Sequence, residues 1–324
     1  MGKTLITLAL WLSVSAQAIE INKEKIFEPI FKEVEHPWMV LGVLEFPFYS
    51  FYLGAPAVHG VAYLPNFAPR LGPKIIYKDV GATFTFGLPI PANEKRRRGD
   101  STHAGLVLNS YWHQNALDIF FHRFRGFYVS SPFTELSFNK PERYPQLPDA
   151  RVTTYGINWY HVADPDRYSL RAAFDLTEFQ LRSGGSWIYN PFYNHLQISV
   201  GNEFVPGIGS ESLVALPNLA SGRMETFGLA AGYGYTYIRG HLFATAQLVL
   251  GPAVQFQRFQ RNDGNDTETM TFSAKANLNA STGWSHEDYV GGFKLLVDTL
   301  WAEVSDTQVY SSLVNVQAFF GHRF

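Results

Sequence analysis

Residues 270–284 read MTFSAKANLNASTGW, and this stretch indicates the fold more clearly than any other. Apolar side chains alternate with small or polar ones along it. Successive side chains of a β-strand point to opposite faces, so the pattern predicts a strand with one apolar and one polar face. We expect Phe272, Leu278 and Trp284 to face lipid, and Lys275 and Asn277 to face a lumen.

The length and recurrence of this pattern favour a membrane barrel over a soluble sandwich. Soluble strands usually have about 5–6 residues, whereas long alternation recurs from about residue 57 to the end. The fold class we predict is all-β: a transmembrane antiparallel β-barrel of about 12 strands over residues 57–324. The expected strands are 57–66, 72–88, 103–113, 116–129, 151–163, 168–181, 186–200, 225–239, 241–259, 268–284, 289–304 and 308–324.

A second alternating stretch, residues 225–238, carries an aromatic band. Tyr233, Tyr235 and Tyr237 share its apolar face, as an aromatic girdle at a membrane interface requires. Glycines occupy much of the opposite face, at Gly228, Gly232 and Gly234. They either leave room for something packed inside the barrel or ease strand bending.

The composition supports export and excludes several classes of protein. Aromatic residues make up 16% and charged residues 17% of the chain, against about 25% charged residues in soluble domains. A net charge of −2 gives no indication of nucleic-acid binding. The absence of cysteine excludes disulfides, thiolate metal sites and a lipid-modified cysteine. No cofactor motif is present, and we expect no cofactor and no metal.

The first eighteen residues resemble a secretory signal peptide. Lys3 provides the positive start, Thr4–Val14 are mostly apolar, and Ala16-Gln17-Ala18 forms a small-residue cleavage site. The apolar run is shorter than the roughly 20 residues that a spanning helix needs. We therefore predict cleavage near Ala18 and a location in the bacterial outer membrane.

Residues 19–56 do not follow the pattern of the remaining chain. Glu20–Glu35 is charged and mixed, whereas Trp38–Leu53 is strongly apolar and aromatic. In order of preference, we expect a periplasmic amphipathic helix, a plug inside the barrel, or an additional strand.

The C-terminus ends on an alternating strand with a terminal aromatic residue. Phe320 and Phe324 share its apolar face. Such an ending resembles the assembly signal of outer-membrane barrels, so the barrel-assembly machinery and outer-membrane lipids are the expected partners.

The middle of the chain resembles an uncharacterised family of bacterial envelope proteins, the DUF4421 type of unknown function. The matching segments are Tyr63-Leu64-Pro65-Asn66, Ile76-Tyr77-Lys78, Leu117-Asp118, Arg125-Gly126-Phe127-Tyr128, Tyr144-Pro145, Pro148-Asp149, Tyr155-Gly156-Ile157-Asn158, Tyr168 to Phe174 and Gln180 to Ser186. Gly184-Gly185 stands where the family usually has Ala-Gly. The resemblance implies an outer-membrane barrel and no particular activity.

The phase of the predicted strands places polar side chains inside the barrel. The lumen candidates are Asn109, His113, Asn158, Arg171, Asp175, Lys275, Asn277, Lys294 and Asp298, together with Asp118 and His122. Charges of both signs favour internal ion pairs, whereas Arg123 and Arg125 fall on the outer face near the membrane edge.

Two functions remain open. The preferred one is a non-enzymatic envelope barrel, which is either a narrow, porin-like pore or a structural or binding protein for a small solute or lipid. The alternative is a lipid hydrolase or acyltransferase in which His122 is the base, Asp118 or Asp175 orients it, and a serine attacks. No G-x-S-x-G or similar motif supports the enzyme.

A basic run, Lys95-Arg96-Arg97-Arg98, separates two predicted strands. It is either a solvated turn or a contact for anionic lipid. Counting strands from residue 57 places it on the periplasmic side, and an additional strand at 38–53 would reverse that assignment.

Overall fold

The computed structural model describes residues 30–55, 58–130, 142–199, 219–261, 266–304 and 307–324. Residues 31–324 form one compact unit. The predicted signal peptide and residues 19–29 lie outside the described residues.

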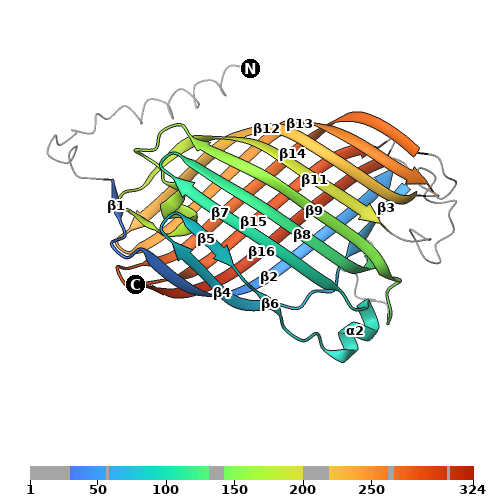
Figure 1. The fold of residues 1–324 in the computed structure, drawn as a ribbon, viewed down its shortest axis with the longest axis horizontal. Coiled ribbons are helices and arrows are strands. Elements are labelled where there is room, and N and C mark those ends of the chain that lie inside the picture. The colour runs from blue at the N-terminus through green and yellow to red at the C-terminus, as the bar shows by residue number, and fades with distance from the viewer. Residues whose placement is uncertain (1–29, 56–57, 131–141, 200–218, 262–265, 305–306) are drawn as a thin grey trace, which may run out of the picture. The chain divides into compact units, whose positions relative to one another are not determined.

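The unit is an antiparallel β-barrel (Figure 1). Its long strands are β2 (Trp38–Ala55), β7 (Thr102–Trp112), β8 (Asn115–Ser130), β9 (Gln146–Val162), β11 (Gly184–Ser199), β12 (Leu219–Arg239), β13 (Leu242–Arg261), β14 (Asp266–Ser285), β15 (Tyr289–Val304) and β16 (Thr307–Arg323). Shorter strands are β1 (Phe31–Glu33), β3 (Val58–Leu64), β4 (Arg70–Tyr77), β5 (Val80–Thr83), β6 (Phe86–Gly87) and β10 (Glu178–Gln180). Two helices accompany them, α2 (Ala92–Arg98) and the π-helix η3 (Arg171–Asp175).

The ring closes between the first long strand and the last. β2 pairs with β16 along Met39–Gly54, and the backbones of Trp38 and Phe324 are hydrogen-bonded. We call the end that carries this pair the proximal end, and the opposite end the distal end. Among the described residues, twelve strands close the proximal ring, in the order β2, β16, β15, β14, β13, β12, β11, β9, β8, β7, β5 and β4. Toward the distal end, β3 joins β2 to β8 directly.

The predicted count of about 12 strands is confirmed, but its members differ from those expected. Trp38–Ala55 is a full strand of the ring, the least preferred of our three alternatives for that stretch. Its alternation was hidden because Met39, Leu41 and Val43 pack inside the barrel while Val40 and Phe46 face outward, so both faces are apolar. Pro47 is tolerated where β2 pairs with neither β3 nor β4.

Two of the predicted strands were wrong. Residues 72–88 form a hairpin of β4 with β5 and β6, because Lys78 adopts a positive φ of 51° and reverses the chain. Residues 168–181 contain η3 and the three-residue β10. Their apolar side chains pack inside the barrel, so the apolar pattern there did not report a lipid-facing strand.

The basic run lies within α2, toward the distal end of the barrel (Figure 1). Because β2 is the additional strand at 38–53, the later strands run in the opposite direction to those counted from residue 57. β7, which follows α2, begins beside Arg125 in the distal half of β8. Arg97 and Arg98 lie over the rings of Tyr144 and Tyr128, so the basic helix is packed against the barrel.

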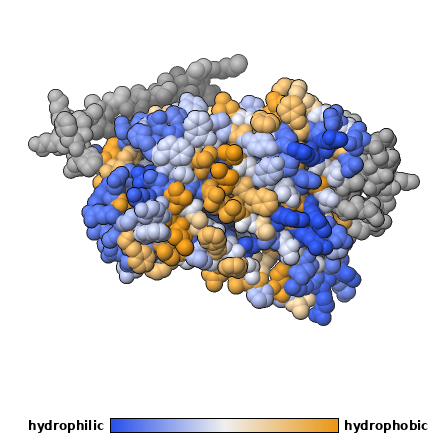
Figure 2. Space-filling view, in the orientation of Figure 1, coloured by the Kyte–Doolittle hydropathy of each residue, from blue (hydrophilic) through white to orange (hydrophobic). Residues whose placement is uncertain are grey.

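The outer face of the barrel is apolar, as predicted from the alternation. Phe272 is 83% exposed, while its neighbours on β14, Lys275 and Asn277, are each 1% exposed. Outward aromatic residues gather toward the proximal end, among them Trp187, Tyr233, Tyr235, Tyr237 and Trp284. Apolar patches also appear on the face shown in Figure 2.

No helix among the described residues is long and apolar enough to cross a membrane.

Candidate functional site: the closed lumen

The connection between β9 and β11, residues 163–183, occupies the proximal part of the lumen, and we call it the plug. Ala172, Ala173, Phe174 and Asp175 of η3 are buried. Tyr168 and Leu170 pack against Ile188 and other inward residues of the wall. Burial raises the pKa of Tyr168, so its hydroxyl remains protonated.

Three strands of the wall hold the plug by charged side chains. Lys74 on β4 pairs with Asp175, at 3.1 Å between Nζ and Oδ1. Lys294 on β15 donates from Nζ to the carbonyl of Phe174 at 2.6 Å. Arg323 on β16 donates to the carbonyl of Leu176 at 2.8 Å. Since charge-assisted hydrogen bonds are stronger than neutral ones, the plug is fixed rather than loosely enclosed.

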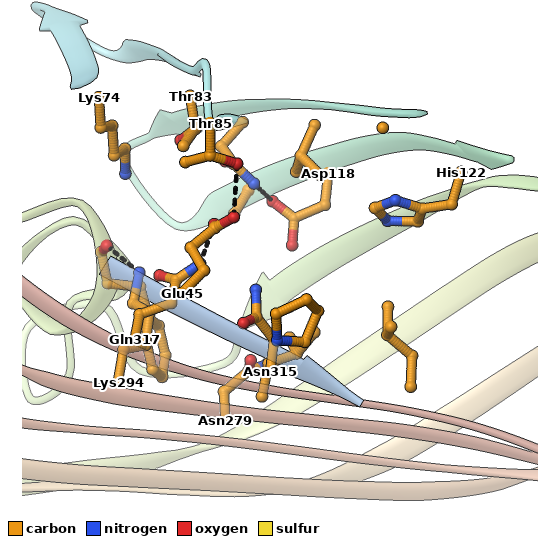
Figure 3. A pocket seen from close by; sticks show the side chains of 18 of the residues that line it. Glu45, Lys74, Thr83, Thr85, Asp118, His122, Asn279, Lys294, Asn315 and Gln317 are labelled. Atoms are coloured by element: carbon orange, nitrogen blue, oxygen red, sulfur yellow. Dashed lines mark hydrogen bonds between the residues drawn. The ribbon is translucent and has the colours of Figure 1, made fainter. Parts of the chain in front are cut away.

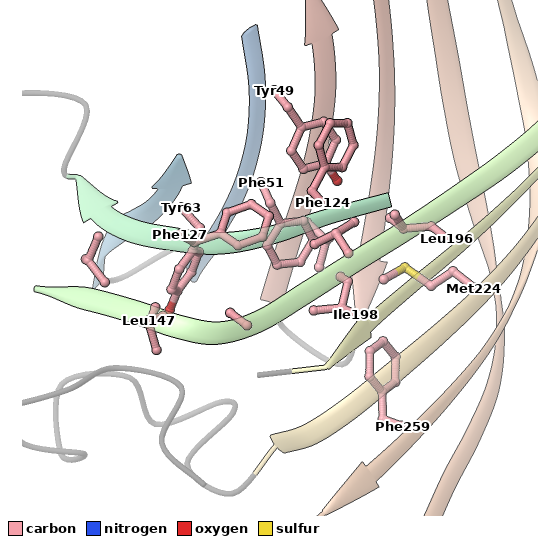
Figure 4. Packing of buried hydrophobic residues seen from close by; sticks show 14 residues of the cluster. Tyr49, Phe51, Tyr63, Phe124, Phe127, Leu147, Leu196, Ile198, Met224 and Phe259 are labelled. Carbon is pink, nitrogen blue, oxygen red and sulfur yellow. The ribbon is translucent and has the colours of Figure 1, made fainter. Parts of the chain in front are cut away.

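The distal part of the lumen is filled by a second, apolar closure (Figure 4). Tyr49 stacks on Phe124 with ring centroids 4.5 Å apart, and Phe127 meets Tyr49 edge-on. The remaining members of this distal cluster include Phe51, Tyr63, Val152, Leu196, Ile198, Met224 and Phe259. These side chains face inward, so the distal lumen is an apolar core.

A polar cavity of about 160 Å³ lies between the two closures. A second cavity of about 130 Å³ adjoins it, and Asn109, Asp118, His122 and Tyr160 line both. A space of this size holds several water molecules or a small polar group.

Glu45 is a centre of hydrogen bonding on the wall of the larger cavity (Figure 3). It accepts hydrogen bonds from Thr85 at 2.6 Å and Gln317 at 2.8 Å. Arg70 approaches the same carboxylate at 3.8 Å and donates to Thr85. The contacts join β2, β4, β16 and Thr85, which lies between β5 and β6.

Lys275 is the centre of a second network inside the barrel. Its ammonium lies 3.0 Å from Asp298 and donates to Asn158 at 2.8 Å. Asn277 donates to Asp298 and accepts from Tyr160. The expected internal pairing of opposite charges is therefore present here.

The catalytic candidates lie near the cavity but do not form a triad. His122 contacts His103, with 3.1 Å between their ring nitrogens. Asp118 accepts a hydrogen bond from Asn109 at 2.6 Å, and Asp175 pairs with Lys74 in the plug. In the described part of the chain, no hydrogen bond links His122 to a serine or a carboxylate.

Two of the lumen candidates lie elsewhere. His113 is exposed in the turn between β7 and β8, because Trp112 pairs directly with Asn115 and the turn begins one residue earlier than expected. Arg171 belongs to η3 rather than to a strand, and it pairs with Asp79 at 3.0 Å and with Glu33 at 3.8 Å. Its side chain faces the proximal end, where these carboxylates lie.

The sequence reasoning missed several residues of the cavity, namely Glu45, Arg70, Lys74, His103 and Gln317. Glu45 carried a signal: it is the only charged residue within the apolar run Trp38–Leu53. Arg70 gave no such signal, since its strand was expected to begin at residue 72, and Lys74 was inside that predicted strand but was not singled out.

Within the described ranges, no group of His, Asp and Glu side chains is arranged to hold a metal ion.

Solved structures with a similar arrangement are bacterial membrane proteins of low identity. The outer membrane protease OmpT from Escherichia coli aligns with a TM-score of 0.39 and 6% identity, covering 90% of this chain and 97% of that chain. Ail, the attachment invasion locus protein of Yersinia pestis, gives a TM-score of 0.28 and 8% identity over 88% and 99%. The P. putida toluene transporter TodX gives 0.26 and 8% over 89% and 90%. These scores transfer no activity, ligand or location to this chain.

No curated protein matches the chain with significance. One family model, described as a domain of unknown function, DUF4421, matches residues 58–324. That range includes the plug and every strand after β2. The resemblance seen in the sequence is thus confirmed, and the chain belongs to the DUF4421 family.

Proposed function

We propose that this protein is an outer-membrane barrel with a closed lumen, which binds a small ligand in its internal cavity and neither conducts freely nor catalyses a reaction. The observation that carries the proposal is the pair of closures in series. The plug fills the proximal lumen, the distal cluster fills the other end, and a polar cavity remains between them.

The apolar outer surface supports placement in a membrane. Outward residues such as Leu229, Leu250 and Phe293 are more than half exposed. Closed barrels and helices can satisfy their backbone groups in a bilayer, and the proximal ring of this barrel is closed through twelve strands. The predicted signal peptide and the terminal Phe324 favour the bacterial outer membrane.

The alternative, a hydrolase, gains no support from the contacts of its candidate residues. A nucleophile and its base need to lie within hydrogen-bond reach, or close to it. His122 instead meets His103, and Asp118 meets Asn109.

Conductance across a planar bilayer tests the proposal. We expect the wild-type barrel to give no steady current. A variant with residues 165–182 replaced by a short Gly-Ser linker should also stay closed, because the distal cluster remains. Combining that deletion with Phe124→Ala and Phe127→Ala should give a stable open channel.

The effect of each closure on conductance can be tested by opening one closure at a time. Phe124→Ala with Phe127→Ala, in a barrel that keeps its plug, should remain closed. Heat-dependent gel mobility would report that each variant is folded. Steady ohmic conductance of the wild-type protein would contradict the proposal, whatever the variants do.

A further inference from the structure

The barrel wall is interrupted between β6 and β7. β5 pairs with β7 through only three residue pairs, Val80↔Ser110, Gly81↔Asn109 and Ala82↔Leu108. Beyond them β6 pairs only with β4, and β7 only with β8. In the described part of the chain, no backbone pairing joins residues 83–88 to residues 102–107. We call this break the seam.

The seam is closed at both ends, so it is an opening of limited length in the wall and not a full-length gap between two strands. On the proximal side the three β5–β7 pairs close it. On the distal side Asn66 donates to Ser101 at 2.8 Å and to Gly99 at 2.8 Å, and Ser101 donates to Gly126. Six residues of β7, 102–107, lie between, which is roughly 20 Å of strand.

The larger cavity reaches the seam from inside. Thr83 and Thr85 line it from one edge, and His103, Gly105 and Val107 line it from the other. Gly105 is exposed although it shares the inward phase of its strand. A Cβ at this position would lie 2.7 Å from His122 Nδ1 and 2.9 Å from His103 Nε2, so any side chain there would crowd the opening.

The outer rim of the seam is apolar. Phe84 is 50% and Phe86 74% exposed on one edge, and Leu106 is 43% exposed on the other. Across the seam, Arg70 donates to the carbonyl of His103 at 3.3 Å. The seam therefore joins a lipid-facing apolar surface to a polar cavity, which suits a molecule with an apolar tail and a polar head.

The charges around the cavity select the kind of head. Arg70 pairs with Glu45 and Lys74 with Asp175. Lys294 and Asp118 also line the cavity, and neither has an ion-pair partner among the described residues. Lys294 is hydrogen-bonded to the carbonyl of Phe174 and Asp118 to Asn109, so each has capacity left for an opposite charge. A cation and a carboxylate without ion-pair partners complement a phosphate and an ammonium group carried by the same molecule.

We propose that the seam admits the headgroup of a zwitterionic phospholipid of the phosphoethanolamine type into the lumen cavity, while its acyl chains remain in the bilayer. This inference rests on the proposed function, because it names the ligand and the route of a closed, ligand-binding barrel.

Lipid retention tests the inference. The purified barrel is reconstituted in vesicles of equal phosphatidylethanolamine and phosphatidylglycerol, extracted again in detergent, washed, and analysed by mass spectrometry. We expect roughly one phosphatidylethanolamine per wild-type barrel, retained in preference to phosphatidylglycerol. Gly105→Leu and Val107→Trp, which narrow the inner mouth from the same strand, should each lower retention by about tenfold.

The matched control is Ala231→Leu, which adds apolar volume on the outward face of β12, away from the seam. It should retain lipid as the wild type does. Equal retention by all four proteins would show lipid bound only to the outer surface and would overturn the inference. Absence of retained lipid, or preference for phosphatidylglycerol, would overturn it as well.

Failure of this inference can be told from failure of the proposed function. A wild-type barrel that is electrically silent but retains no phosphatidylethanolamine disproves the lipid route and leaves the closed barrel standing. A conducting wild-type barrel disproves the closed barrel itself.

Discussion

Lys275 is the residue whose removal should cost the barrel most. It is 1% exposed, and its ammonium meets Asp298 and Asn158 inside the lumen. Breaking a buried ion pair by removing one partner costs about 3–5 kcal/mol, because the other charge stays buried and unpaired. We expect Lys275→Met to lower the free energy of unfolding by that amount in a urea titration followed by tryptophan fluorescence.

A second change separates the loss of the pair from the loss of packing. Lys275→Met combined with Asp298→Leu removes both charges and should recover most of the lost stability. A double variant as unstable as Lys275→Met alone would mean that the packing of the lysine stem matters more than its charge.

At the residue scale, the sequence predicts whether a side chain points inward or outward, but it does not predict which residues that side chain contacts. The alternation of 270–284 placed Lys275 and Asn277 inside and Phe272 outside, because period two is a local property of one strand. It did not predict that Lys275 meets Asn158, 117 residues away, or that His122 meets His103. Such contacts depend on how strands are staggered around the ring, which no single strand encodes.

At the scale of elements, the plug and β12 fit each other through Gly234. A Cβ at Gly234 would lie 2.6 Å from the ring of Tyr168 and 2.8 Å from Ile188. The glycines of β12 were expected either to leave room for a packed group or to ease strand bending. Gly234 leaves room for a packed group, the side chain of Tyr168. We expect Gly234→Ala to displace Tyr168 and loosen the plug, so that trypsin cuts more readily at Arg167, Arg171 or Arg182.

Shortening the displaced side chain should reverse the effect. Tyr168→Ala added to Gly234→Ala relieves the clash, and the plug should regain much of its protease resistance. Gly240→Ala does not serve as a control, since Gly240 has a positive φ of 61°. A suitable control is Ala230→Gly. Ala230 is also buried on β12, and this change adds no volume.

The elements that the sequence misassigned share one property. β2 and the plug both place apolar side chains inside the barrel, where most strands carry polar ones. Hydrophobic periodicity cannot tell an apolar residue that faces lipid from one that packs in a lumen. The strand count came out near 12 because two gains offset two losses: β2 and the split of 72–88 each added a strand, whereas the plug is not a strand and β3 lies outside the proximal ring.

At the scale of the whole molecule, the connections suggest which end faces the cell exterior. Apart from the plug, which folds back into the lumen, the proximal connections include the two-residue turns 78–79, 113–114 and 240–241, whereas the distal connection between β11 and β12 spans residues 200–218. Outer-membrane barrels have short periplasmic turns and longer external loops. The proximal end should therefore face the periplasm.

Because the chain has no cysteine, single substitutions can report this orientation. Asp266→Cys, at the exposed distal start of β14, should react with a membrane-impermeant maleimide on intact cells. His241→Cys, in the turn between β12 and β13, should react only after the outer membrane is permeabilised. If the proximal cysteine reacts on intact cells and the distal one only after permeabilisation, the proximal end faces the cell exterior and the proposed orientation is wrong.

The barrel can close only when its last strand, β16, is present to pair with β2. Glu45 on β2 and Gln317 on β16 are hydrogen-bonded across 272 residues of chain. Until β16 has been synthesised, β2 and β15 each present an unpaired edge, and a bilayer offers nothing to satisfy those backbone groups. A nascent chain released a few residues early therefore cannot settle in the membrane as a smaller barrel. It keeps two unpaired strand edges and stays open to proteolysis, so that the pairing of β2 with β16 separates complete barrels from incomplete ones.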